Sequence, residues 1–141
     1  MGGVHFEFED FKQLISLNIG IAERIDDNRK ESFSVLYCDF SDMPDIEVVK
    51  SLEQILRNAD SVINYKTDYF FIFPYTDKYG ANCVKEMFDD FFGKSLNSSV
   101  VSYPIDGEKS ENIIFSLQNI TDEKYNKSLD YLDRFIEDIE E

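Results

Sequence analysis

The sequence contains very few residues of the kinds that metal and redox chemistry use. Its 141 residues include one histidine, His5, and two cysteines, Cys38 and Cys83. His5 has no cysteine or carboxylate at ligand spacing, so we expect an exposed residue near the N-terminus rather than a metal ligand. Both cysteines lie in apolar or amphipathic segments, where buried free thiols are expected rather than a disulfide or a redox pair. Because one histidine near a terminus cannot complete a nucleophile–histidine set either, the sequence predicts no metal, no cofactor and no catalytic residues of these kinds.

Basic residues and long apolar runs are also scarce. Lysine and arginine number 14 against 29 aspartates and glutamates, which gives a net charge of −15. Such a charge repels phosphate backbones and anionic lipid surfaces, so we expect neither a nucleic-acid polymer nor a membrane as partner. No segment approaches the roughly 20 apolar residues of a membrane helix. The N-terminus lacks the basic and apolar segments of a signal peptide, and a cytoplasmic location is therefore expected.

Large apolar side chains are abundant instead. Hydrophobic residues make up 43% of the chain and include 13 phenylalanines and 8 tyrosines, enough for one well-formed core. Periodicity predicts alternating elements: a helix over 9–27, a strand over 33–40, a helix over 46–57, strands over 61–65 and 68–74, a helix over 80–92, a strand over 99–103, and helices over 110–117 and 122–139.

The order of these elements predicts the fold class. Without the first and last helices it is strand, helix, strand, strand, helix, strand, which is the ferredoxin-like βαββαβ arrangement of an α+β protein. We therefore expect one sheet with flanking helices and extra N- and C-terminal helices. The whole forms a single compact domain, divided into an N-terminal helix over 1–30, a central part over 31–118 and an acidic amphipathic C-terminal helix over 119–141.

The residues around the predicted hairpin carry a recognisable pattern. Arg57 and Asp60 form Arg-x-x-Asp, five residues follow, and then comes the run Lys66, Thr67, Asp68, Tyr69, Phe70. This segment resembles the signature of GGDEF (diguanylate cyclase) domains, which have Gly-Gly-Asp-Glu-Phe at the hairpin. Similar matches in the same order occur in 36–41, 72–81 and 101–107. The resemblance covers about 33–117 and implies a nucleotide-cyclase-like form of the fold.

The departures from that signature predict that cyclase activity is lost. Lys66 and Thr67 replace the glycines that let the nucleotide approach the backbone. Tyr69 replaces a glutamate, and Ser41 stands where the family has a second aspartate on the first strand. In the family these acidic residues hold two Mg²⁺ ions, so Asp39 is left as a vestigial metal position. The helix and loop that recognise guanine in the family are also missing. We expect the chain not to be an enzyme.

Arg57 and Asp60 admit two interpretations. In the family an Arg-x-x-Asp at this spacing forms an inhibitory site for cyclic di-GMP, and an arginine fork suits a phosphate or a guanine edge. The resemblance therefore makes Arg57 and Asp60 candidate ligand-binding residues. The alternative, which we favour, is an ordinary ion pair between residues three apart at the end of a helix.

The expected C-terminal helix suggests a further surface. Its apolar residues repeat at spacings of 4, 3, 4 and 3 and would form one seam: Tyr125, Leu129, Leu132, Ile136 and Ile139. We favour a helix docked on the domain's own sheet. The other interpretation is a seam for a homodimer or another protein partner.

Two functions from different classes follow. The leading hypothesis is a catalytically inactive, GGDEF-like signalling or regulatory domain that acts through protein–protein contact, with cyclic di-GMP sensing as an addition. The alternative is a small acidic inhibitor or immunity-type protein whose negative surface covers a basic partner.

Overall fold

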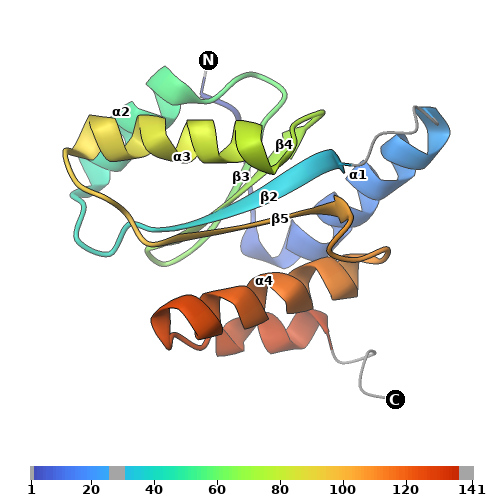
Figure 1. Ribbon diagram of the computed structural model, residues 1–141. Coiled ribbons are helices and arrows are strands. Elements are labelled where there is room, and N and C mark those ends of the chain that lie inside the picture. The colour runs from blue at the N-terminus through green and yellow to red at the C-terminus, as the bar shows by residue number, and fades with distance from the viewer. Residues whose placement is uncertain (1, 26–30, 137–141) are drawn as a thin grey trace.

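The computed structural model of the chain describes residues 2–25 and 31–136 (Figure 1). Its elements in chain order are β1 (Val4–Phe6), η1 (Phe8–Asp10), α1 (Phe11–Ile25), β2 (Glu31–Asp39), α2 (Asp45–Ile55), β3 (Ser61–Tyr65), β4 (Asp68–Pro74), α3 (Lys78–Phe92), β5 (Ser98–Pro104), α4 (Ser110–Tyr125) and η2 (Asp130–Phe135). Within the described ranges, no helix combines the length and apolarity needed to span a membrane.

The sheet has the strand order β1-β3-β4-β2-β5. The pairs β3–β4, β4–β2 and β2–β5 are all antiparallel, and together they form the ferredoxin-like sheet. The predicted α+β class and the order of its central elements are therefore confirmed. The additional strand β1 pairs in parallel with the edge of β3, from Val4 opposite Ser61 to Phe6 opposite Ile63. The sequence did not predict β1, because three residues are too few to display an alternating pattern.

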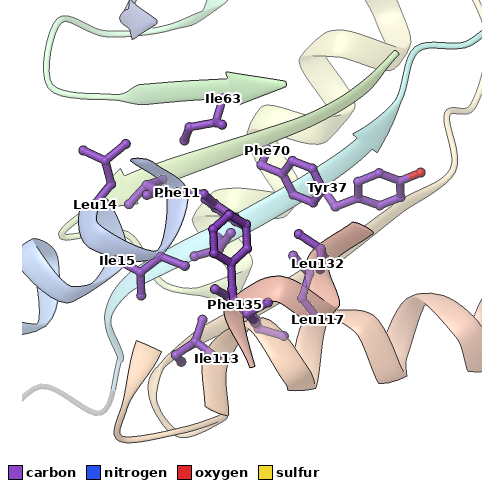
Figure 2. Close-up of a cluster of buried hydrophobic side chains, with 14 of the residues drawn as sticks. Phe11, Leu14, Ile15, Tyr37, Ile63, Phe70, Ile113, Leu117, Leu132 and Phe135 are labelled. Carbon is purple, nitrogen blue, oxygen red and sulfur yellow. The ribbon is translucent and has the colours of Figure 1, made fainter. Parts of the chain in front are cut away.

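Two helical layers cover the sheet, and the alternation of side chains divides the core between them. Figure 1 shows α2 and α3 on one face and α1 and α4 on the other. On β2, Val35 and Tyr37 point toward α1 and α4, whereas Leu36 and Cys38 point toward α2 and α3. Every one of these side chains is buried. Figure 2 shows the cluster on the α1 and α4 face, where Tyr37 lies with its hydroxyl at the margin of the apolar side chains.

The N-terminal helix starts and packs differently from the prediction. A short 3-10 turn precedes it, and α1 begins at Phe11. Ile19 is buried, whereas Ile21 and Ile25, farther along the helix, are exposed. The end predicted at residue 27 lies outside the described residues. The helix therefore contacts the sheet mainly through its first half.

The C-terminal part corrects the sequence prediction. A single helix, α4, replaces the expected helix over 110–117 and the start of the one over 122–139, so the boundary expected at 118/119 falls inside it. It ends at Tyr125, and the next residue, Asn126, has a left-handed backbone (φ 52°) and donates its N–H to the Asp122 carbonyl at 2.8 Å. Asparagine tolerates this conformation better than most residues. The chain then turns back, so a continuous helix over 122–139 was wrong.

This turn gives a test of the fold. Asn126→Ala should lower the free energy of unfolding by about 1 kcal/mol, because a Cβ-bearing residue without a short polar group is disfavoured at positive φ. Asn126→Gly should leave it nearly unchanged, since glycine adopts this conformation freely. Urea denaturation followed by circular dichroism measures both values. Equal losses for the two variants would contradict the assignment of Asn126 as the left-handed end of α4.

Candidate functional site

The candidate site forms where β2 ends and β4 begins. Asp39 and Asp68 are directly opposite each other in the antiparallel register of these strands. Because opposite residues share a face of the sheet, their side chains point to the same side as Tyr37, toward α4 and η2. Asp68 is only 8% exposed. The vestigial metal position, Asp39, therefore lies beside a second carboxylate, that of Asp68.

A lysine from the C-terminal segment lies between these carboxylates. The Nζ of Lys127 is 2.8 Å from Oδ1 of Asp68 and 3.3 Å from Oδ2 of Asp39. It also donates to the hydroxyl oxygen of Tyr37 at 2.8 Å. Lys127 follows directly after the turn at Asn126, so the end of α4 determines where its side chain starts.

Two tyrosines complete the surroundings of Asp68. The hydroxyl of Tyr37 donates to Oδ1 at 2.7 Å, and that of Tyr131, in η2, donates to Oδ2 at 2.6 Å. The ring of Tyr131 stacks on that of Tyr65 with centroids 4.0 Å apart. Both carboxylate oxygens of Asp68 are thus occupied by donors from β2, from the loop after α4 and from η2.

The charges in this cluster are held in their ordinary ionic forms. Desolvation lowers the pKa of Lys127, but the hydrogen bond and charge of Asp68, together with Asp39, outweigh it and raise that pKa. Burial raises the pKa of Asp39, but the N–H and hydroxyl of Ser41 and the Lys127 ammonium outweigh this and lower it. Desolvation and Asp68 raise the pKa values of Tyr37 and Tyr131. Each of the four pKa values is shifted further from 7, so none of these groups is tuned for proton transfer near pH 7.

The residues present do not fit a divalent metal ion. One oxygen of Asp39 accepts the backbone N–H of Ser41 at 2.9 Å, and the other faces Lys127. Tyr69 lies on the opposite face of the sheet, with its ring packed against Phe40 at 5.0 Å between centroids. In the part of the chain that the structure describes, no group of three or more His, Cys, Asp or Glu residues could hold a metal. An ammonium in contact with both carboxylates adds a positive charge that repels such an ion.

The other residues of the hairpin motif have structural environments. Lys66 has a left-handed backbone (φ 56°), and the carbonyl of Thr67 accepts the N–H of Phe40 at 3.0 Å, which ties the turn to the end of β2. Phe70 is fully buried and packs on Phe11, with ring centroids 5.0 Å apart. The turn carries side chains at both of its positions rather than a bare backbone.

Arg57 and Asp60 lie together, as the spacing predicted. Oδ2 of Asp60 accepts the backbone N–H of Arg57 at 2.8 Å, and Oδ1 accepts from its Nη2 at 2.9 Å. Asp60 is 2% exposed, and its carbonyl accepts the N–H of Val4 from β1. Both carboxylate oxygens therefore already have donors within the chain. A guanine base would have to displace Arg57 before it could bind to Asp60.

The proposed C-terminal seam does not form one exposed surface. Leu129, Leu132 and Ile136 are buried in the cluster beneath α1 and α4. Tyr125 points elsewhere: its hydroxyl accepts the N–H of Ser98 and donates to the Ser98 carbonyl, both at 2.9 Å. Ile139 lies outside the described residues. The three buried residues pack against the chain's own core and are not available to a partner.

Sequence reasoning missed the roles of Tyr37, Lys127 and Tyr131. Tyr37 lies in an apolar run, which predicts only a place in a strand. Lys127 and Tyr131 lie in a segment whose periodicity predicts a helix. A usable signal was present, because a tyrosine and an aspartate at buried positions both require partners. It did not identify which distant residue would supply them.

The comparison with known proteins supports the fold. No family model matches the chain, and no curated protein matches it in sequence. Among solved structures, a sensory box/GGDEF family protein from Caulobacter crescentus CB15 matches with a TM-score of 0.59 and 14% sequence identity. The match covers 86% of this chain and 92% of the other. At this identity the likeness shows the fold alone, which is nucleotide-cyclase-like.

The hydrogen bonds of Asp68 can be tested one donor at a time. Tyr131→Phe should reduce the free energy of unfolding by about 1–2 kcal/mol, because the variant leaves one oxygen of a buried carboxylate without its donor. Tyr79→Phe is the matched control, since Tyr79 is 79% exposed and should tolerate the same change. Chemical denaturation of both variants measures the difference. A Tyr131→Phe variant as stable as the control would show that this donor is dispensable.

Proposed function

We propose that this chain is a catalytically inactive, GGDEF-like signalling domain that acts through contact with another protein. The observation that carries the proposal is the ammonium of Lys127 between Asp39 and Asp68. A cyclase of this kind uses metal ions at that place to neutralise the triphosphate and activate the attacking hydroxyl. The chain's own cation does neither, because it is fixed by three protein acceptors.

Two further features support the loss of activity. Lys66 and Thr67 place side chains on the turn where a nucleotide would need to approach the backbone. The net charge of −15 also opposes binding of a triphosphate unless metal ions or a local basic cluster compensate for it.

Exposed apolar residues support a role in protein contact. Leu17, Ile21 and Ile25 are spaced four residues apart along α1 and therefore share one face of that helix. Each is more than two-fifths exposed. Exposed apolar surface that the protein's own fold does not use is characteristic of contact sites.

Loss of catalysis is tested with GTP and Mg²⁺. We expect no cyclic di-GMP or pyrophosphate above background when the purified chain is incubated with both, measured by chromatography of the nucleotides. An active cyclase run in parallel shows that the assay works. Measurable product that disappears on denaturing the chain would refute the proposal.

Cyclic di-GMP sensing at Arg57 and Asp60 is a separate hypothesis. The Arg57 side chain is 62% exposed, which favours it, whereas the internal bonds of Asp60 oppose it. Titration calorimetry with cyclic di-GMP, at a protein concentration on the order of tens of micromolar, tests this hypothesis. A site with a dissociation constant in the micromolar range or below gives measurable heat at that concentration. We expect no heat. Heat that Arg57→Ala abolishes, with the variant still folded, would establish sensing at this site.

The acidic-inhibitor hypothesis predicts a different kind of interface. Binding of a basic partner through the charge of −15 would weaken steeply as salt is added. Contact through apolar residues such as Leu17 and Ile21 would depend little on salt. The salt dependence of partner binding therefore separates the two hypotheses.

A further inference from the structure

Lys127 comes from the segment after α4 and brings a positive charge between Asp39 and Asp68. We infer that its ammonium is the resident cation of the Asp39–Asp68 pair, supplied by the chain in place of a bound metal ion. The inference deepens the proposed loss of the metal site and rests on it. Loss of catalysis alone does not specify what stabilises the two facing carboxylates of Asp39 and Asp68.

The pair needs a cation for an electrostatic reason. Asp39 and Asp68 are directly opposite on neighbouring strands, where like charges destabilise a sheet. Asp68 is largely removed from water, so the repulsion is screened less than at the surface. A buried carboxylate without a counter-charge is strongly destabilising. One cation that contacts both carboxylates removes the repulsion.

The geometry around Lys127 is that of a complete cation site. An ammonium has three N–H donors and no acceptor. Here Nζ has three acceptors: Asp68 at 2.8 Å, Tyr37 at 2.8 Å and Asp39 at 3.3 Å. Every donor has an acceptor, so the ammonium has no hydrogen-bonding capacity left for a further ligand.

The segment that carries Lys127 is anchored on both sides of it. On one side is the left-handed turn at Asn126. On the other side is Leu129, which is buried and whose carbonyl accepts a hydrogen bond from Nε2 of Gln118 at 2.8 Å. Further along, Tyr131 donates to the same carboxylate as Lys127. These contacts order the backbone, so that fixing the ammonium costs only the rotamer freedom of the lysine side chain.

A cation attached to the chain has a distinct consequence for metal dependence. Chelation cannot remove it, and the domain's stability should not depend on metal concentration. Taking the ammonium away should leave two facing carboxylates that attract a divalent ion from solution. The dependence on metal is therefore expected to appear only when Lys127 is replaced.

The test compares Lys127→Met with Lys124→Met, two variants that each lose one positive charge. Lys124 donates to the Ser98 carbonyl at 2.7 Å and has no carboxylate partner among the described residues. Thermal unfolding is followed with EDTA and with millimolar Mn²⁺. We expect Lys127→Met to lower Tm by about 5–10 °C in EDTA and to regain part of that loss in Mn²⁺. The wild type and Lys124→Met should show no difference between the two conditions.

A second pair of variants locates the effect. Lys127→Arg retains the charge and should show no response to Mn²⁺. Adding Asp39→Asn to Lys127→Met should remove the response, because only one carboxylate then remains. If Lys127→Met does not fold in EDTA, recovery of its circular dichroism spectrum in Mn²⁺ is the readout, and no recovery overturns the inference.

Other outcomes would also overturn it. These are a wild type stabilised by Mn²⁺ as much as Lys127→Met, a Lys124→Met variant with the same response, or a response that persists with Asp39→Asn. Turnover of GTP would refute the proposed function without touching these unfolding measurements, so the two proposals can fail separately.

Discussion

The buried carboxylate of Asp68 is the constraint on which much of the structure depends. A buried charge must be given partners, and this one obtains them from three places in the chain: Tyr37 in β2, Lys127 after α4, and Tyr131 in η2. The hairpin, the central strand and the C-terminal segment are thereby held at one point. The same contacts explain why the C-terminal segment packs across this face instead of continuing as a helix.

The hairpin residues that match the GGDEF signature in type have structural roles in this chain. Asp68 anchors the polar cluster and Phe70 belongs to the core, so both side chains are required by the fold. Tyr69 has an aromatic neighbour, Phe40, where a glutamate would be poorly accommodated. Residues that match a signature in type can thus have packing roles, which is why a resemblance in residue type does not by itself establish activity.

The central fold could be predicted because its signals are local. The run 69–73 is continuously apolar, which is typical of a strand covered on both faces, and the structure shows β4 covered in this way. The end of α4 could not be predicted, since Asn126 is also compatible with a helix interior and only packing decides between the two. The polar cluster was missed because Lys127 and Tyr37 are separated by 90 residues, and no local pattern links them.

That long separation has a consequence for how the domain is assembled during synthesis. A chain grows from its N-terminus, so β2 and the hairpin emerge well before Lys127 and the residues of η2. Until then the two facing aspartates lack their counter-ion and the apolar face beneath η2 lacks its cover. Contacts this distant also require the closure of a long loop, whose entropic cost slows folding. The domain therefore reaches its final state only after almost the whole of the described chain has left the ribosome, and a nascent chain stalled after α4 would be a natural target for chaperones.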